Sequence, residues 1–499
     1  MKTVIKIDPE KEYKQAKKII ELATKERLNQ DLATSLDASV DNLITAARVL
    51  MEREELRRGK KKTIPKKNKS KKHTRSEQRK EAKKLPSERF PNLEIKENKI
   101  EPDHVPLCPC CNEPMKESGL FDIAEKLEII PKQYYIVREK RSKYNCSNCH
   151  GSMINTPATP SIVPTSNYGD SLILDVSLSK YCDLIPIERY AQIAAREGLV
   201  GLPPQSLIGL THHLANFLDT VYQKIKEEIL LDAVVHADET PHKMLEGDKR
   251  NNWYLWGFFT QTSCYFEAHN TRSGDIALDF LTKSNARYLL TDGYAGYHKA
   301  IHILNDKHGK DLTEVFCNAH AYRYFKDACE TWEEDGSPPL RLYGQIYELE
   351  RERFTNLDNL NIQEQLNIRQ KMLPLFEQIK QFCEQNLDGV MPGSSLKKSI
   401  QYFLNHYDGL TVCTTNIEVP LDNNLSEREM RSPVIGRKTW FGTHSKRGAK
   451  TNATLFSIVH SCKINNINPR NYFPWIVTQL LKGLPAMTPF KYSKIMEIQ

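Results

Sequence analysis

The spacing of hydrophobic and polar positions divides the 499-residue chain into stretches of different character. Residues 12–56 follow a helical pattern. Five apolar residues recur there at spacings of 4, 3, 4 and 3: Leu36, Val40, Leu43, Ala47 and Leu50. Such spacing places them on one face of a helix. The repeat covers only about two heptads, so a dimerising helix and a helix packed on its own chain are equally consistent with it.

A second helical stretch covers residues 170–231, after a connector rich in Pro, Ser and Thr at 153–170. Residues 188–219 read as a helix, a turn containing glycine and another helix. This order fits a helix-turn-helix that binds DNA. It fits a helical hairpin with a purely structural role at least as well.

The pattern changes to strands and helices over residues 232–330. LDAVVHADET, WYLWGFF and CYFEA are β-prone runs, and shorter strands then alternate with helices. Three antiparallel-looking strands followed by this alternation predict a mixed α/β sheet, in the order expected of a ribonuclease-H-like fold. Residues 335–410 are helical by pattern, which predicts a helical insertion over about 335–415 within that domain.

These patterns predict an α/β protein with a small additional module. We expect the following segments: an N-terminal helical region at 1–56, a basic linker at 57–100, a small cysteine-bounded module at 101–155, a helical and possibly DNA-binding region at 170–231, the catalytic α/β domain at 232–462 and a C-terminal segment at 463–499.

Positive charge is concentrated in residues 57–84. This segment has 15 Lys and Arg against two Glu, whereas the whole chain has a net charge of only +8. A polyanion such as DNA is the natural partner of such a segment. Four of its lysines are candidate DNA contacts: Lys66, Lys67, Lys71 and Lys72. The alternative is a solvated linker that only keeps the protein soluble.

The hydrophobic pattern predicts neither a transmembrane segment nor a secretory signal. No run of 18 apolar residues occurs, and the N-terminus lacks the apolar core of a secretory signal. We expect a cytoplasmic protein, associated with the bacterial nucleoid through DNA.

Two Cys-x-x-Cys pairs lie 34 residues apart, one of Cys108 and Cys111 and one of Cys146 and Cys149. Two such pairs supply the four thiolates of a tetrahedral, structural Zn²⁺ site, which would stabilise a module too short to fold alone. Their neighbours Cys110 and His150 are alternative ligands, so the metal is better defined than its ligand set.

Acidic residues follow two apolar runs. Asp238 ends VVHAD and Asp292 ends RYLLTD, so we expect both at the carboxyl ends of neighbouring buried strands. Carboxylates placed side by side repel each other, and a divalent cation relieves this repulsion. Each Asp alone is also compatible with a helix cap or a turn, since Gly293 follows Asp292.

A third acid, Glu427, lies in a helical segment with Arg428 and Arg431 on the same face. This carboxylate would complete a metal site while the arginines bind phosphate. Arg437 and Lys438 add positive charge where a DNA backbone would run. A surface helix with ordinary ion pairs explains the same pattern.

Four sequence blocks resemble the transposases of the insertion sequence 66 family: HADETPHKML, LLTDGYAGYHKA, FCNAHAYRYF and LDNNLSEREMRSPVIGRKTWFGTHSKRGA. They span about 210 residues in the family's order. The cysteine module, the basic N-terminal region and the tail from about 465 resemble the corresponding parts of that family. The resemblance implies that Asp238, Asp292 and Glu427 are the catalytic acids. Cys317 and His320 match a Cys-x-x-His element of related transposases, for which we expect a structural role.

The resemblance implies a DDE-type transposase that cuts the ends of a mobile element and joins the freed 3′-hydroxyl to target DNA. Two Mg²⁺ or Mn²⁺ ions held by the three acids would support this in-line displacement. Its DNA partners would be the terminal inverted repeats of the element and the target DNA. On DNA it would assemble as a homodimer or a higher oligomer, and accessory proteins of the element would be further partners. The alternatives are a non-catalytic, domesticated DNA-binding protein and a structure-specific nuclease of the same fold.

Overall fold

The computed structural model of the chain describes the following residues: 84–101, 104–110, 112–116, 123–145, 153–246, 252–330 and 333–497. The chain divides into two compact units, one of residues 55–136 and one of residues 1–54 together with 137–499. The predicted N-terminal helix and Lys66, Lys67, Lys71 and Lys72 of the basic segment lie outside the described residues.

The smaller unit contains the short helix α4 (Pro86–Arg89) and a tight turn at Cys108. Ser87 donates to the carboxylate of Glu125 through its backbone N–H and its hydroxyl, at 2.7 and 2.8 Å. An antiparallel bridge pairs Leu107 with Pro114, and the Asn112 N–H donates to the Cys108 carbonyl at 2.9 Å. Cys108, the first residue of the first cysteine pair, therefore lies on a closed hairpin turn.

The larger unit begins with a two-stranded ladder and four helices. The ladder pairs β1 (Lys143–Tyr144) with β2 (Ile154–Asn155) in antiparallel register. The helices are α5 (Asp170–Tyr181), α6 (Ile187–Arg196), α7 (Pro204–Phe217) and α8 (Asp219–Leu231). The predicted order of helix, turn and helix is thus confirmed as α6 and α7. Because Leu207, Leu210 and Leu214 of α7 are buried, the helix has a structural role, and its contact with DNA stays a prediction.

A five-stranded mixed sheet forms the centre of this unit, in the order β5-β4-β3-β6-β7. The strands are β3 (Val234–Lys243), β4 (Asn252–Phe259), β5 (Cys264–His269), β6 (Tyr288–Thr291) and β7 (Thr313–Phe316). β3, β4 and β5 pair antiparallel, whereas β6 and β7 run parallel to β3. The helices between them are α9 (Asp275–Thr282), α10 (Ala295–His308) and α11 (Asn318–Cys329). The predicted mixed α/β sheet is confirmed.

Helix α17 (Lys446–Ile464) covers the edge strand β5. Its Ser457 and Ser461 hydroxyls accept the backbone N–H groups of Phe266 and Cys264, at 2.8 and 3.0 Å. An edge strand otherwise leaves such donors open to pairing with another chain. Helix α16 (Asn424–Trp440) packs on β3 and β4, and α18 (Pro469–Leu481) and α19 (Pro489–Met496) follow α17.

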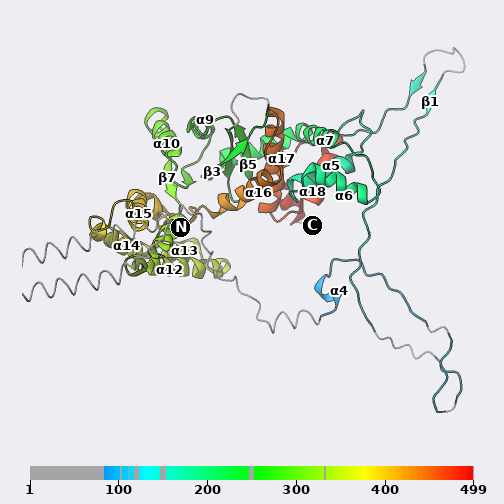
Figure 1. Cartoon of the computed structure of the whole chain (residues 1–499), viewed down its shortest axis with the longest axis horizontal. Coiled ribbons are helices and arrows are strands. Elements are labelled where there is room, and N and C mark those ends of the chain that lie inside the picture. Colours follow the sequence, from blue (N-terminus) through cyan, green and yellow to red (C-terminus); the bar gives the residue numbers. More distant parts are fainter. Residues whose placement is uncertain are drawn as a thin grey trace, which may run out of the picture. The chain divides into compact units, whose positions relative to one another are not determined.

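The helical pattern predicted for residues 335–410 is confirmed as four helices. They are α12 (Glu333–Thr355), α13 (Ile362–Gln370), α14 (Leu373–Asn386) and α15 (Ser395–Thr411), with 3-10 turns η1 (Leu357–Asn359) and η2 (Val412–Thr414). Together with α11, β6 and β7 they enclose one hydrophobic core. In Figure 1 they gather on one side of the sheet, and α5, α6, α7 and α18 lie on the other.

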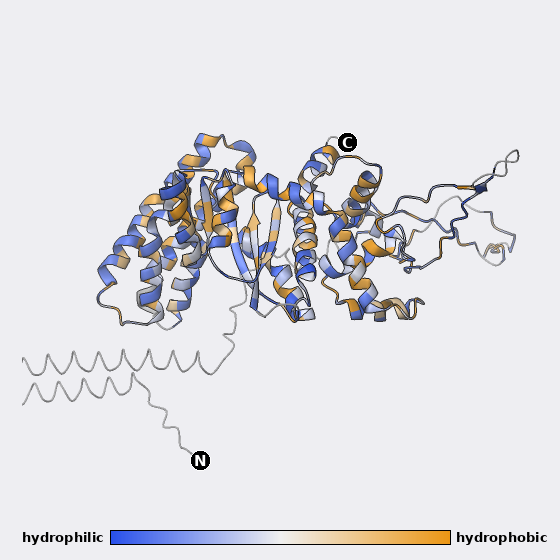
Figure 2. Ribbon diagram, turned by 90° about the horizontal axis from the view of Figure 1, so that it is seen from above, coloured by the Kyte–Doolittle hydropathy of each residue, from blue (hydrophilic) through white to orange (hydrophobic). Residues whose placement is uncertain are grey.

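Most helices of the larger unit carry hydrophobic residues on one face only. Figure 2 shows orange and blue alternating along the insertion helices, as expected for helices that each bury one stripe against the shared core. No helix in the described ranges is long and apolar enough to cross a membrane.

A buried ionic network ties this insertion to the segment that leads into α16. Arg369, almost fully buried, donates to both carboxylate oxygens of Glu350, at 2.8 and 3.2 Å. Arg353 donates to the same carboxylate. The Arg369 guanidinium also donates to the carbonyls of Cys413 and Val419. Burial works to raise the pKa of Glu350, but the two arginines outweigh it and hold that pKa below its usual range.

Arg369→Met is expected to lower the free energy of unfolding by about 3–5 kcal/mol, because it leaves buried carbonyls and part of a buried carboxylate unpaired. Urea unfolding followed by circular dichroism measures this change. Arg341→Met, at an exposed position of α12, is the matched control and should change stability little. If Arg369→Met lowers the free energy of unfolding by less than about 1 kcal/mol, the network does not contribute substantially to stability.

Candidate active site

Strand register brings Asp238 and Asp292 together. β3 and β6 are parallel, and their last paired residues are His236 and Leu290. Continued by two residues, this register places Asp238 opposite Asp292. The charge of Asp292 contributes to the raised pKa of Asp238, which agrees with the two carboxyl groups lying near each other. Both residues are half-buried.

The predicted position of Asp238 at the end of its strand is wrong. β3 continues to Lys243, and Asp238 pairs with Gly257 of β4 in the middle of the strand. The antiparallel partner β4 supports this extension, while the parallel partner β6 stops before Asp238. Asp238 therefore lies where β3 loses one neighbour and keeps the other, which leaves its side chain room beside the sheet.

Asp292 follows β6 directly, as predicted. It begins a turn in which its Oδ1 accepts the Tyr294 N–H at 3.1 Å. Gly293 has a φ of +91°, a conformation that favours glycine. The sequence left open whether Asp292 is a turn residue or a site residue; it is a turn residue here, and its charge acts on Asp238.

Glu427 lies in the first turn of α16, where a negative charge interacts favourably with the helix dipole. Its two carboxylate oxygens accept from Arg323 Nη2 of α11, at 2.7 and 2.8 Å. His320 Nε2, also from α11, lies 3.6 Å from Glu427 Oε1. The third acid thus binds α11.

Electrostatics couples the three acids. Burial, together with the charges of Glu239, Asp292 and Glu427, raises the pKa of Asp238 to about 8. A carboxylate that is hard to ionise beside other carboxylates is the environment that a divalent cation relieves, and oxygen ligands suit Mg²⁺. The donor set of Asp238, Asp292 and Glu427 therefore fits such a cation.

Glu239, next to Asp238, is already satisfied within the protein. Its Oε1 accepts from Arg272 at 2.6 and 2.8 Å, and its Oε2 accepts from the Tyr297 hydroxyl at 2.7 Å. Its side chain is almost fully buried. We therefore assign Glu239 to the support of the site and not to its ligands.

Asn423, immediately before α16, connects the elements that carry Asp238 and Glu427, and the sequence analysis missed it. Its Oδ1 lies 2.7 Å from His236 Nδ1, and its Nδ2 donates to the Ala237 carbonyl at 3.3 Å, both on β3. Its backbone N–H donates to Cys317 Sγ at 3.1 Å, at the start of α11. This fully buried amide holds α16, α11 and β3 together within a few residues of Asp238 and Glu427.

The Cys-x-x-His element has two different environments. Cys317, His320 and Glu427 offer ligand atoms that all lie within 4.8 Å of one another. However, Cys317 Sγ is buried and accepts the Asn423 N–H, and both oxygens of Glu427 bind Arg323. Cys317 therefore acts as a structural contact, as predicted. His320 faces the site, and its buried Nδ1 has no hydrogen-bond partner in the structure.

The basic residues predicted for α16 differ in their surroundings. Arg428 is 62% exposed and donates to Glu429 at 2.7 Å, and Arg431 and Lys438 are exposed. Arg437 instead donates to the Thr240 hydroxyl at 3.1 Å and to the Pro241 carbonyl, so it fastens α16 to β3. Three of the four side chains are thus accessible to a phosphate backbone.

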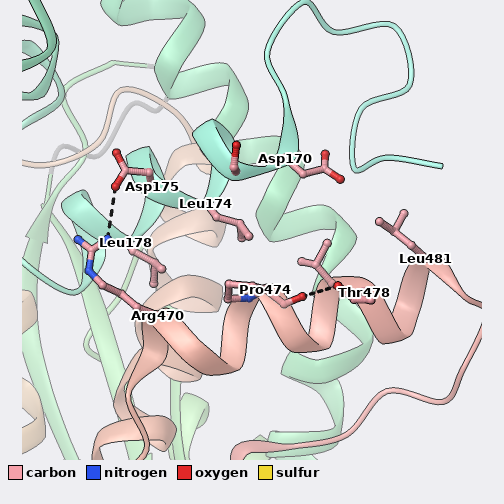
Figure 3. Close-up of a pocket in the computed structure, with 10 residues that line it drawn as sticks. Asp170, Leu174, Asp175, Leu178, Arg470, Pro474, Thr478 and Leu481 are labelled. Atoms are coloured by element: carbon pink, nitrogen blue, oxygen red, sulfur yellow. Dashed lines mark hydrogen bonds and ion pairs between the residues drawn. The ribbon is translucent and has the colours of Figure 1, made fainter. Parts of the chain in front are cut away.

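A cavity of about 410 Å³ lies away from the acids, between α5 and α18 (Figure 3). Its carboxylates are already bound: Asp175 pairs with Arg470 at 3.3 Å and accepts from the Tyr190 hydroxyl, and Asp170 accepts the Ile162 N–H. The cavity offers apolar walls and paired charges, which do not suit phosphodiester chemistry.

The zinc module is described only in part. Cys108 lies on its hairpin turn with Cys110, whereas Cys111, Cys146, Cys149 and His150 lie outside the described residues. The closed turn at Cys108 has the tight shape that two ligands from one Cys-x-x-Cys pair require.

Comparison with known proteins identifies the same family in two separate parts of the chain. Residues 165–451 match the family model described as "Transposase IS66 family", and residues 106–150 match the "zinc-finger binding domain of transposase IS66". Two similar proteins from Sinorhizobium fredii carry the names "Uncharacterized protein y4hP" and "Uncharacterized protein y4jD". The first is 24% identical over 75% of this chain and 70% of its own length, and the second is 26% identical over 77% and 76%. The first family model covers more than half of the chain, and the chain therefore belongs to the IS66 family of transposases.

Proposed function

We propose that this transposase cleaves DNA at the ends of an insertion element and joins them to target DNA, with Asp238, Asp292 and Glu427 as its catalytic acids. The observation that carries the proposal is the register of β3 and β6, which sets Asp238 opposite Asp292. The raised pKa of Asp238 is the electrostatic consequence of that closeness and of burial.

The fold supports the same reaction. In the sheet order β5-β4-β3-β6-β7, the strand of the first acid lies between an antiparallel hairpin and two parallel strands. We infer from this order a ribonuclease-H-like catalytic domain, into which the helices α12–α15 are inserted between the second and third acids.

Asp238, Asp292 and Glu427 would hold the two Mg²⁺ or Mn²⁺ ions that we assign as cofactors. When bound, these ions activate the attacking oxygen and stabilise the departing one. The chain's own contribution is positional: Asp238 and Asp292 are fixed by the sheet, and Glu427 is fixed by the first turn of α16. Arg428, Arg431 and Lys438 are then placed on α16 to hold the DNA backbone beside these acids.

Each acid is testable by an isosteric amide. Asp238→Asn, Asp292→Asn and Glu427→Gln are each expected to lower cleavage and strand transfer on the order of 10³-fold or more, because each removes a charged ligand. DNA binding should change little. The assay incubates the protein and Mg²⁺ with labelled DNA from the sequences that flank its own gene, together with a supercoiled plasmid as target.

Asp279→Asn is the matched control, since Asp279 is an exposed residue of α9 that pairs with Lys283. Near-full activity of Glu427→Gln would show that the third acid is misassigned. The products also separate other functions. Cutting of branched DNA without joining would indicate a structure-specific nuclease, and binding without any cut would indicate a non-catalytic DNA-binding protein.

The zinc-finger match supports a structural Zn²⁺ in the cysteine module. We propose Cys108, Cys111, Cys146 and Cys149 as its ligands. Four thiolates leave no open coordination position, so this ion would stabilise the module and take no part in phosphodiester chemistry. The module and the basic segment beside it are then surfaces for DNA, on which the protein assembles as a dimer or higher oligomer.

Replacing a ligand should release the zinc. Cys146→Ser is expected to lower the zinc content from about one ion per chain to nearly none, because three thiolates bind Zn²⁺ far more weakly than four. Elemental analysis of the purified full-length protein measures this content. Cys110→Ser is the matched control, and loss of zinc in that variant instead would place Cys110 in the ligand set.

A further inference from the structure

Arg323 forms an ion pair with the third acid, Glu427, and has no role in the reaction proposed so far. It lies on α11, one helical turn after His320. Its Nη2 donates to both oxygens of Glu427, at 2.7 and 2.8 Å. The Arg323 side chain is 48% exposed and that of Glu427 is 29% exposed, so the pair lies at the rim of the site and not in the core.

This ion pair draws Glu427 toward α11. The Glu427 carboxylate lies within 4.8 Å of ligand atoms of Cys317 and His320. Among the described residues, the carboxylates of Asp238, Asp292 and Glu427 do not form an equally close group. In this arrangement both oxygens of the Glu427 carboxylate are therefore bound on the α11 side.

An arginine and a metal ion compete for the same lone pairs of a carboxylate. We propose that Arg323 is a phosphate-binding residue of the active site, which neutralises Glu427 in the DNA-free protein and transfers to a DNA phosphate when Glu427 turns to the catalytic metal. The inference rests on the proposed role of Glu427 as a metal ligand. A part-exposed ion pair is weak, so a doubly charged ion can displace it.

The surroundings favour phosphate as the second partner of Arg323. A guanidinium binds phosphate oxygens in the same two-pronged way as it binds a carboxylate. The other acid near Arg323 is Asp422, and its Oδ1 is already bound to the Asn424 N–H at 3.0 Å. Once Glu427 turns away, the half-exposed Arg323 guanidinium is open to a DNA phosphate, as the exposed Arg428 and Arg431 of α16 are.

Metal affinity gives the first test. In the DNA-free, zinc-loaded protein, Arg323→Ala is expected to bind Mn²⁺ about fivefold more tightly, because it removes the competing cation from Glu427. Calorimetric titration with Mn²⁺ measures the dissociation constant. Cleavage should fall in the same variant on the order of 10²-fold, through the lost phosphate contact, and Arg323→Lys should recover part of it. Arg287→Ala, which removes an exposed pair with Glu418, is the matched control.

The salt dependence of DNA binding gives the second test. Without a divalent ion, Arg323 is occupied by Glu427, so Arg323→Ala should leave the slope of log affinity against log salt unchanged. With Ca²⁺, an ion that takes oxygen ligands, Arg323→Ala should have a shallower slope than the unchanged protein. The difference should correspond to the loss of about one phosphate contact.

A purely structural ion pair predicts other results. If Arg323 only anchors α16 to α11, Arg323→Ala will weaken Mn²⁺ binding, lower the melting temperature and leave both salt slopes unchanged, which would overturn the proposal. Full cleavage activity of Arg323→Ala would overturn it as well. These failures are distinct from failure of the proposed function, because full activity of Asp238→Asn would refute the three-acid site itself.

Discussion

Repulsion between carboxylates is the constraint on which the rest of this structure depends. Asp238 lies within β3 and Asp292 directly follows the neighbouring strand β6, and burial makes ionisation of Asp238 costly. Neither side chain can move away freely, because one is fixed by the β3–β4 pairing and the other by the turn at Gly293. In the proposed site, a divalent cation bound beside these carboxylates would relieve their repulsion.

The surrounding elements hold this arrangement through a small number of buried polar contacts. Asn423 connects α16 to β3 and to the start of α11, so the helix of the third acid is positioned against the strand of the first. The helical insertion contributes from a distance, because Arg369 binds the carbonyls of the segment that leads to Asn423. An insertion of four helices between the second and third acids is therefore part of the support of the site.

The sequence predicted much of this architecture because its patterns are local. The apolar strands, the helices of the insertion and Asp292 after β6 all follow from runs of a few residues. The position of Asp238 inside β3 could not be predicted, since it depends on pairing with β4 across a turn. The contacts of Asn423 and Arg323 could not be predicted from local patterns either. Arg323 and Glu427 are 104 residues apart in the sequence, and only the fold brings them together. The resemblance to a family identified Glu427 where periodicity alone allowed a surface helix.

The most direct test of the central claim is the anomalous scattering of Mn²⁺ in crystals of the zinc-loaded protein with DNA. The account predicts manganese peaks at the carboxylates of Asp238, Asp292 and Glu427, with the Arg323 guanidinium moved from Glu427 to a phosphate. Manganese bound elsewhere, with the three carboxylates unliganded and Arg323 still on Glu427, would contradict it.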